Sequence, residues 1–443
     1  MCRKLDSING WILVKTKQSQ GYSHFFIKVW RRVSTYLTYC LSLPLAFFFI
    51  LLFPFVRVRF LCLFSDRIGH YSLNTERLLC ILKESHYSKR DIFLFYIRDA
   101  PICNLQLHVM WRRIIHIIPF ARLCAQLDQV MLLVLKGRYK NNVLRALETP
   151  FGGQDNNGLL VKHEPHLSFT SGEHQRGKSL MKELGLPEGA CFICLSVRDS
   201  AYLSKVFPDS DWSYHNCRDS NILNYEKAAL YLAELGYYVI RMGKFVQSEF
   251  SLSHSNIIDY ANHRLRSDFL DIYLSAHCHF FISTSTGLDG VPQVFRRPIL
   301  ITDLFPASGQ IQYWFPFKLF LTKMIKHQKN GDYLTFSEIN TIFSGQSSVE
   351  RLLKEHNLEI QANTQEELLD IVDEMVKRVN NTWRETDEDA ALQASLLNAF
   401  PVCLIQGGNQ AMPAKEQLKI RMGSRFLKQY KLELLQEVAE YVS

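Results

Sequence analysis

The sequence predicts an α/β protein in which parallel strands alternate with helices, preceded by a basic and strongly apolar N-terminal segment. From residue 56 onward, short apolar strands follow helical stretches, and polar residues gather where those strands end. Of the 443 residues, 47% are hydrophobic and 21% are charged, which suits a large buried core and argues against disorder. At about 150 residues per domain, this length allows two or three domains.

The positive charge is concentrated at the N-terminal end. The formal net charge is +8, and residues 1–67 account for it with ten Lys and Arg against two Asp. A nucleic-acid binder is expected to spread its basic residues over the folded surface, whereas the rest of this chain is balanced. We therefore expect no nucleic-acid partner.

The basic residues bracket an uncharged run, residues 33–56. Its length and apolar character predict contact with a membrane surface, by crossing it or lying in its interface, with a buried core helix as the alternative. A cleaved signal peptide is disfavoured because no small-residue cleavage pattern follows. Pro44 and Pro54 are expected to kink or end the helix, which we place on the cytoplasmic face of the cell membrane. The residues expected to meet anionic headgroups are Arg31, Arg32, Arg57 and Arg59.

The elements that follow are predicted from periodicity, capping and turn residues. Strands are expected at 56–64, 91–97, 191–197, 237–241, 256–259, 279–283 and 299–302. Helices are expected at 74–84, 106–118, 120–136, 222–235, 267–276, 364–379 and 412–441. The stretch 151–158 predicts a loop, and the polar region 151–187 a hinge between domains.

Polar residues follow several of these strands directly. Arg198 and Asp199 follow strand 191–197, Arg241 ends strand 237–241, and a hydroxyl-rich turn follows strand 279–283. Because ligands of parallel α/β sheets bind beyond the carboxyl ends of the strands, these residues are expected to share one crevice. The residues of the turn are Ser283, Thr284, Ser285, Thr286 and Gly287. Such a turn entering a helix predicts binding of a phosphate or diphosphate, and an ordinary capped turn is the alternative.

The individual polar residues each admit a structural alternative. Arg198 can meet phosphate oxygens bidentately or form a salt bridge with Asp199. Arg218 opens the next helix and fits either a ligand or a capping role. Arg241 fits a second phosphate contact or a solvated strand end. Asp268 can reach a ribose or base, or simply stabilise the helix dipole.

His70 is the candidate general base of the first half. It sits in a Gly-His turn after the first strand, where it can take a proton from a hydroxyl, and a capping or core histidine is the alternative. No metal is expected, since the spacing of His163, His166 and His174 fits no standard zinc pattern. Cys191 and Cys194 face opposite ways on a strand, which indicates buried thiols.

Several segments resemble a divergent family of bacterial glycosyltransferases associated with surface-polysaccharide biosynthesis. The similarity covers roughly residues 56–430 and is specific between 186 and 303. The segments that carry it are FICLSVRDSAYL (192–203), RDSNILNY (218–225), GYYVIRMG (236–243), RSDFLDIYL (266–274), FISTSTGLDGVPQVFRRP (281–298), RIGH (67–70) and MGSRFL (422–427).

The resemblance implies a GT-B fold, in which two Rossmann-like domains face a cleft. It implies metal-independent transfer from a nucleotide-sugar, the co-substrate, to a lipid-linked or polysaccharide acceptor, with no other cofactor. Ser196 stands where the similar strand motif of fucosyltransferases has histidine, so the donor sugar is not implied. The expected division is a membrane-associated segment (1–55), an acceptor domain (56–185), a donor domain (186–400) and a helical tail (401–443).

Under this hypothesis Arg198 and the 283–287 turn stabilise the leaving diphosphate, and His70 deprotonates the acceptor hydroxyl. Two alternatives stay open. One is a nucleotide-sugar epimerase or hydrolase of the same fold, since the hydroxyl-Gly turn also occurs in such epimerases. The other is a non-catalytic, membrane-tethered scaffold.

Overall fold

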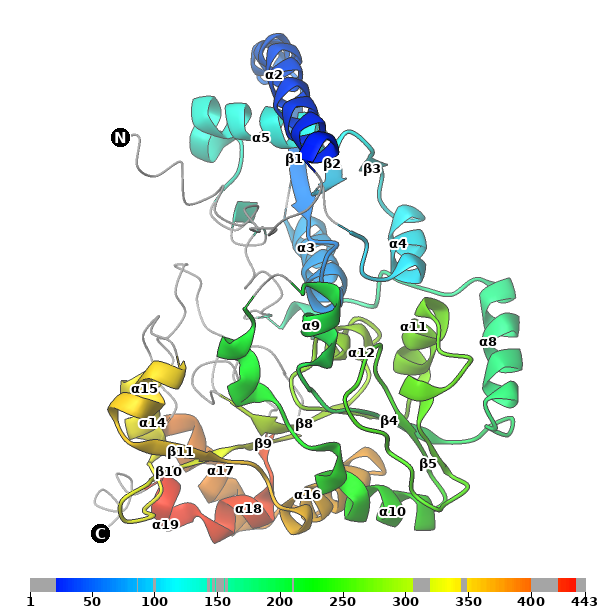
Figure 1. The fold of residues 1–443 in the computed structure, drawn as a ribbon, viewed down its shortest axis with the longest axis vertical. Helices are drawn as coiled ribbons and strands as arrows, with labels where there is room; N and C mark the ends of the chain where they lie inside the picture. Colours follow the sequence, from blue (N-terminus) through cyan, green and yellow to red (C-terminus); the bar gives the residue numbers. More distant parts are fainter. Residues whose placement is uncertain are drawn as a thin grey trace.

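The computed structural model describes residues 21–435 except for a set of short gaps, and it shows a mixed α/β chain with two parallel sheets (Figure 1). The gaps are 86, 99–100, 142–143, 146–147, 149–154, 156–157, 209–210, 306–318, 344–348 and 400–420. We call the elements α2 through α7 the N-terminal half and those from α8 onward the C-terminal half. The predicted 151–158 loop lies almost wholly outside the described residues.

The C-terminal half is built on a seven-stranded sheet of order β12-β9-β8-β7-β4-β5-β6, in which every pairing is parallel. Its strands are β4 (Phe192–Ser196), β5 (Tyr238–Arg241), β6 (Ile257–Ile258), β7 (Phe281–Ser283), β8 (Ile299–Leu304), β9 (Leu319–Thr322) and β12 (Arg421–Met422). An antiparallel pair, β10 (Met324–His327) and β11 (Leu358–Gln361), lies beside it. The N-terminal half has the parallel sheet β1 (Arg57–Leu63), β2 (Asp91–Ile97) and β3 (Ile117–Ile118).

Helices cover both sheets. Those of the N-terminal half are α2 (Gly21–Leu52), the π-helical turn η2 (His70–Asn74), α3 (Thr75–Glu84), α4 (Leu105–Arg112), α5 (Ala121–Leu135), η3 (Lys136–Arg138) and α7 (Leu159–Lys162). Those of the C-terminal half are α8 (Ser171–Glu183), α9 (Ala201–Val206), η4 (Ser213–Arg218), η5 (Ile222–Tyr225), α10 (Glu226–Glu234), η6 (Tyr260–Asn262), α11 (Asp268–His277), η7 (Gly287–Asp289), α12 (Gly290–Val294), α14 (Phe336–Phe343), α15 (Val349–Glu355), α16 (Gln365–Val379), α17 (Asp387–Ala399), α18 (Ser424–Gln429) and α19 (Lys431–Leu434). In Figure 1, α10 and α16 lie on the side of the large sheet away from the N-terminal half, and α11 and α12 on the side toward it.

The expected alternation of strands and helices is confirmed in both halves, with two differences. The helix expected over 106–118 ends early, since α4 covers Leu105–Arg112 and Ile117–Ile118 form β3 instead. The chain after residue 304 also differs from the prediction. The described part of the helix expected over 412–441 is instead β12 followed by two short helices. Gly423 explains the break: its N–H donates to the carbonyl of Phe320 on β9, and an added Cβ would lie 3.0 Å from Leu321. The prediction for 364–379 is confirmed by α16, which Thr364 and Glu367 begin with a reciprocal capping box.

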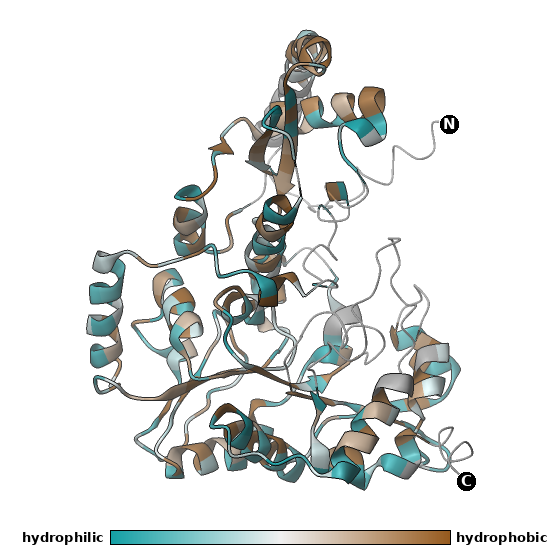
Figure 2. Cartoon of the chain, turned by 180° about the vertical axis from the view of Figure 1, so that it is seen from behind, coloured by the Kyte–Doolittle hydropathy of each residue, from teal (hydrophilic) through white to brown (hydrophobic). Residues whose placement is uncertain are grey.

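Helix α2 lies with α5 at the end of the molecule furthest from the large sheet (Figures 1 and 2). It runs through Pro44 and ends before Pro54. Of its described side chains, Ser42 and Ala46 are fully buried, and Phe49 packs edge-on against Phe60 of β1, with 5.7 Å between ring centroids. Among the described residues, none of the helices is both long and apolar enough to cross a membrane.

Candidate functional site

A cavity of about 320 Å³ lies between the two halves, at the carboxyl ends of β4, β5 and β7. The N-terminal half lines it with residues 67–70, 73–74 and 103–104. The C-terminal half lines it mainly with the segments that follow these three strands, together with Arg266 and Asp271 around the start of α11. Because parallel strands end at the same edge of a sheet, their polar extensions meet here, as the sequence predicts.

Four arginines line the cavity: Arg67, Arg198, Arg218 and Arg266. Arg266 is paired with Asp271, whereas the charges of the other three act on one another. The guanidinium of Arg218 donates to the carbonyl of Ser285 at 2.7 Å. Burial and the charge of Arg198 together lower the pKa of Arg218 to about 10, while Asp289 acts in the opposite direction. Burial also lowers the pKa of Arg198; Asp219 opposes that shift and Arg67 adds to it. Since the guanidinium groups perturb one another, they concentrate positive charge in one place.

Acidic residues offset only part of this charge. Arg198 Nε lies 3.2 Å from Asp219 Oδ1. The salt bridge of Arg198 is therefore with Asp219 and not with Asp199, the partner considered from the sequence. Asp199 lines the cavity, but its carboxylate accepts the backbone N–H groups of Ala201 and Gln247, each at 2.9 Å. Two further carboxylates line the cavity: Asp271 pairs with Arg266, and Asp289 accepts the Ser283 hydroxyl at 3.1 Å. With Lys244, the lining holds five Lys or Arg against three Asp, so an excess of positive charge remains that suits a multiply charged anion.

The hydroxyl-rich turn after β7 forms one wall of the cavity. Ser283 and Thr284 lie beneath the surface, where the Thr284 hydroxyl accepts the N–H of Arg198 at 2.7 Å and so fixes the end of β4. The hydroxyl groups of Thr286 and Ser196 are hydrogen-bonded to each other at 3.1 Å. Ser285 has a φ of 57°, in the left-handed region that non-glycine residues rarely occupy. Its side chain is 6% exposed and lines the cavity, yet its Oγ has no hydrogen-bond partner among the described residues. A buried, unpaired hydroxyl is a group that a bound ligand can satisfy.

The two halves touch through glycine backbones at this wall. A Cβ on Gly69 would lie 3.0 Å from the carbonyl oxygen of Gly287. A Cβ on Gly290 would lie 2.6 Å from Ser72 Oγ and 3.2 Å from Gly69 Cα. Only residues without side chains allow this close approach, which places η2 directly beside the hydroxyl-rich turn.

His70 begins η2 and lines the cavity. Burial lowers the pKa of its imidazole, and the neighbouring charge of Arg67 lowers it further. Asp66 and a hydrogen bond with Asn74 act in the opposite direction without reversing the shift. The ring is therefore neutral at neutral pH and able to accept a proton, as a general base must be.

Four of the predicted site residues lie outside the cavity wall: Ser283 and Thr284, which are buried beneath it, and Arg241 and Asp268. Arg241 is 1% exposed, and its guanidinium pairs with Asp259 at 3.0 Å and donates to the carbonyl of Ser248. Arg241 therefore belongs to a buried structural ion pair. It is neither a phosphate contact nor a solvated strand end, the two roles considered from the sequence. Asp268 begins α11 and accepts the N–H of Leu105 at 2.9 Å, which joins the two halves at one rim of the cavity.

Other residues at the site were not singled out from the sequence. Arg67 and Lys244 line the cavity directly. Lys323, which is 5% exposed, donates to the carbonyls of Cys217 at 3.1 Å and Asp219 at 2.6 Å, and so holds the backbone on both sides of Arg218. Arg67 stands next to the Gly-His turn and could have been found there. Lys323 acts on carbonyl groups and leaves no side-chain pattern in the sequence.

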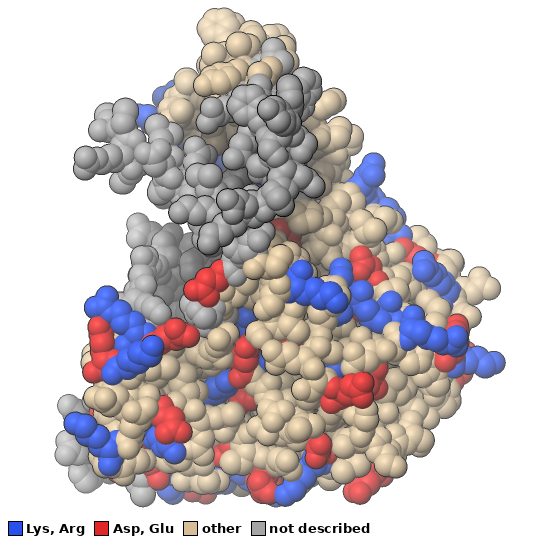
Figure 3. Space-filling view, viewed as in Figure 1, with Lys and Arg blue, Asp and Glu red and all other residues tan. Residues whose placement is uncertain are grey.

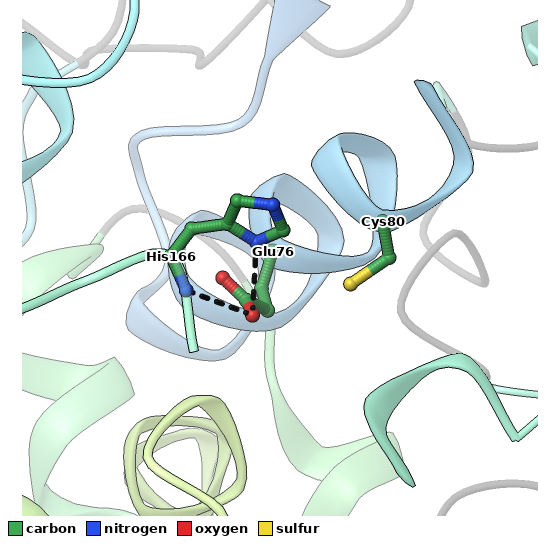
Figure 4. Close-up of side chains that lie close together, drawn as sticks. All are labelled: Glu76, Cys80 and His166. Atoms are coloured by element: carbon green, nitrogen blue, oxygen red, sulfur yellow. Dashed lines mark hydrogen bonds and ion pairs between the residues drawn. The ribbon is translucent and has the colours of Figure 1, made fainter. Parts of the chain in front are cut away.

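Glu76, Cys80 and His166 form the one group in the described residues whose side chains could together hold a metal ion (Figure 4). His166 Nδ1 lies 3.2 Å from Glu76 Oε1. Arg296 donates to the same oxygen at 2.7 Å. Burial raises the pKa of Cys80 to about 12, although a hydrogen bond from Arg296 opposes the shift. Because a guanidinium already contacts both the carboxylate and the thiol, this cluster is better described as an ion pair that ties α3 to the end of α12.

No family model and no curated protein sequence matches the chain. Solved structures of similar shape include a glycosyl transferase of family 9 from Veillonella parvula, with a TM-score of 0.44 and 11% identity over 73% of this chain and 98% of that one. The ADP-heptose LPS heptosyltransferase II of E. coli has a TM-score of 0.29 and 12% identity over 55% and 84% of the two chains. The iron-containing dodecameric heptosyltransferase TibC has a TM-score of 0.34 and 9% identity over 73% and 78%. At these scores the chemistry of the site has to be argued from its own residues.

Proposed function

We propose that the protein is a glycosyltransferase that moves a sugar from a nucleotide-sugar donor to an acceptor hydroxyl, with the donor diphosphate bound in the cavity between the halves. One observation carries the proposal. Arg67, Arg198 and Arg218 converge on a cavity whose wall also presents the buried, unpaired hydroxyl of Ser285. A diphosphate supplies the negative charge and the acceptor oxygens that these groups lack.

The proposed reaction assigns a role to each half. The acceptor oxygen forms a bond to the anomeric carbon while the bond from that carbon to the diphosphate breaks. His70 takes the proton of the acceptor hydroxyl, and its lowered pKa keeps the imidazole unprotonated beforehand. Arg198 and Arg218 meet the negative charge that develops on the departing diphosphate. In this mechanism the guanidinium groups fill the role that a divalent cation would otherwise have, so we propose metal-independent transfer.

The similarity of residues 186–303 to glycosyltransferases of surface-polysaccharide assembly supports a GT-B arrangement of the two halves. It also supports a lipid-linked or polysaccharide acceptor at the bacterial envelope, reached from the cytoplasmic face.

Calorimetric titration of the full-length protein with a panel of nucleoside diphosphates tests the proposal. We expect one of them to bind, and Arg198→Ala and Arg218→Ala each to weaken it by about 10- to 100-fold, since charge-assisted hydrogen bonds are lost. Arg264→Ala is the matched control, because that side chain is 77% exposed, pairs with Glu183 and does not line the cavity.

Three results would contradict the proposal in different ways. Failure of every nucleoside diphosphate to bind would favour the non-catalytic scaffold. Binding followed by isomerisation or hydrolysis of the nucleotide-sugar, with no acceptor glycosylated, would favour the epimerase or hydrolase. An equal loss of nucleoside diphosphate affinity in Arg264→Ala and in the two cavity variants would show that the arginines act only through the overall charge.

A further inference from the structure

Helices α2 and α5 expose an apolar surface that the C-terminal half does not cover. The most exposed large side chains of α2 are Tyr36 (71% exposed), Leu41 (58%), Phe47 (63%) and Leu51 (58%). Phe55, three positions beyond the helix, is 70% exposed. Phe120, Leu133 and Val134 add exposures of 66%, 75% and 57% from α5 and the residue before it. We call these eight residues the apolar apex. Scattered single apolar residues are normal on protein surfaces, but a continuous set of this kind marks an interaction site.

The apolar apex belongs to a helix that is itself docked on the protein. Ser42, Ala46 and Phe49 recur at helical spacing and form the inner stripe of α2, which Phe53 continues just beyond the helix; the stripe packs on α5 and β1. Gln126 of α5 also donates to the Thr38 hydroxyl at 2.9 Å. Since one stripe is held by protein, the remaining faces of α2 are the ones open to a partner.

Basic residues surround the end of α2 where it meets β1. The N–H of Arg57 donates to the carbonyl of Arg90 at 2.7 Å, and Arg59 donates to the carbonyl of Arg138 at 3.0 Å, which brings three chain segments together here. Four side chains on these segments are exposed: Lys89, Arg90, Lys136 and Arg138. We call these four the basic rim. Arg59, expected from the sequence to meet headgroups, is instead 6% exposed and paired with Asp91 at 2.8 Å. Arg31 and Arg32 lie outside the side chains that the structure describes.

Acidic residues do not oppose this rim. In the described residues of segments 33–63, 87–98 and 120–141, the only acids are Asp91 and Asp128, and both are buried. Where Figure 3 draws described residues at the corresponding end of the molecule, the face in view shows uncharged atoms with Lys and Arg at the side, and none of these described atoms belongs to Asp or Glu. An apolar surface with a cationic border and no exposed acid is complementary to an anionic lipid surface, whose acyl region takes the apolar groups and whose headgroups take the cations.

We infer that the apolar apex and the basic rim together dock the protein on an anionic lipid bilayer, with α2 lying at the interface as part of the folded domain. The inference does not depend on the proposed glycosyl transfer, because it concerns a surface remote from the cavity. If both hold, docking places the cavity near acceptors that are carried on lipid.

Flotation of the full-length protein with lipid vesicles tests this inference. We expect binding to vesicles of phosphatidylcholine that contain phosphatidylglycerol, and weaker, salt-insensitive binding to pure phosphatidylcholine. The double variant Phe47→Glu/Leu51→Glu, which charges two neighbours on one side of α2, should bind at least about tenfold more weakly. Lys89→Glu/Lys136→Glu should remove only the preference for anionic lipid.

The matched control is Val161→Glu/Leu235→Glu, at positions 51% and 49% exposed but outside the apolar apex. Thermal unfolding of each variant shows that it is folded. Equal vesicle binding by the apex and control variants would overturn the inference. It would also be overturned if the protein ignored vesicles and formed a dimer that Phe47→Glu/Leu51→Glu converts to monomer, since the apex would then bind a second copy.

Discussion

The two halves of the molecule bury their apolar side chains in different ways. The seven-stranded sheet of the C-terminal half has one continuous core that runs from β4 to α19. The N-terminal half has three smaller clusters around a three-stranded sheet. The largest of these is completed by Ile272, Val291 and Val294, which come from α11 and α12 of the C-terminal half. The C-terminal half is therefore self-sufficient, whereas the N-terminal half depends on its neighbour.

This difference corresponds to a division of chemical roles. The C-terminal half presents Arg198, Arg218 and the hydroxyl-rich turn from the ends of a rigid sheet, which suits a fixed anion site. The N-terminal half contributes His70 and Arg67 from one segment, η2 and the residues before it. The base is thus held in place by contacts between the halves.

The largest expected effect separates these roles. His70→Ala should lower kcat by about 100- to 10,000-fold, the usual contribution of a general base, and leave binding of the nucleoside diphosphate unchanged. Arg198→Ala should instead weaken that binding. Steady-state kinetics together with calorimetry measures both quantities.

The pH profile sharpens this prediction. Since the pKa of His70 is lowered, its base form predominates at neutral pH, so kcat should stay level there and fall tenfold per unit only well below pH 6.5. A loss of activity already above pH 6.5, or loss of nucleotide binding in His70→Ala, would contradict the assignment.

Unequal cores predict unequal stability. Trp111 is fully buried in the N-terminal half and donates to the carbonyl of Tyr71 at 3.0 Å. Trp111→Ala leaves a large cavity, so it should lower the free energy of unfolding by about 3–5 kcal/mol. In urea unfolding, an early transition should move to lower urea concentration. Leu300→Ala, in the fully buried β8, should move a later transition instead. A single transition that shifts in both variants would mean that the halves unfold as one unit.

The ion pair between the halves should contribute less. Glu76 is fully buried and accepts from Arg296 at 2.7 Å, so Glu76→Gln leaves a guanidinium without its counter-charge. We expect a loss of about 2 kcal/mol in the free energy of unfolding, confined to the early transition. Glu188→Gln removes one partner of an exposed pair and should change nothing measurable.

The smallest expected effect concerns the glycine contact. Gly290→Ala places a methyl group 2.6 Å from Ser72 Oγ, which cannot move freely because it donates to the carbonyl of Ile68 at 2.7 Å. The halves must shift apart, which should lower the free energy of unfolding by about 1 kcal/mol. Calorimetry should show severalfold weaker binding of the nucleoside diphosphate. Gly172→Ala, which meets nothing within 4 Å, is the control. Undiminished affinity in Gly290→Ala would show that the contact does not shape the cavity.

The sequence predicts the C-terminal half well as far as β8, because local signals suffice there. The apolar strands, the Ser267 cap of α11 and the hydroxyl-rich turn can each be recognised from a few consecutive residues. The strands after residue 304 were missed: β12 pairs with β9, about one hundred residues earlier, and β9 itself lies between β8 and this distant partner. The helix expected over 412–441 was wrong for the same reason, since Gly423 serves a contact that periodicity does not show.

The site shows the same limit. Arg198 directly follows one apolar strand and Arg241 ends the next, so the two look alike in the sequence. In the structure Arg198 lines the cavity while Arg241 is neutralised by Asp259, and only the fold brings that carboxylate within 3.0 Å. A strand end thus predicts where a side chain lies, but its partner decides whether it is available to a ligand.

The bare backbone contact between Gly69 and Gly287 also determines how the two halves can move. Hinge opening would pull Ile272, Val291 and Val294 out of the N-terminal core and expose them to water. Sliding along the glycine contact requires no side chain to change rotamer, because neither residue has one. The joint therefore favours shear over hinge bending, and donor entry and product release are expected to accompany small lateral displacements of η2 across the end of the sheet.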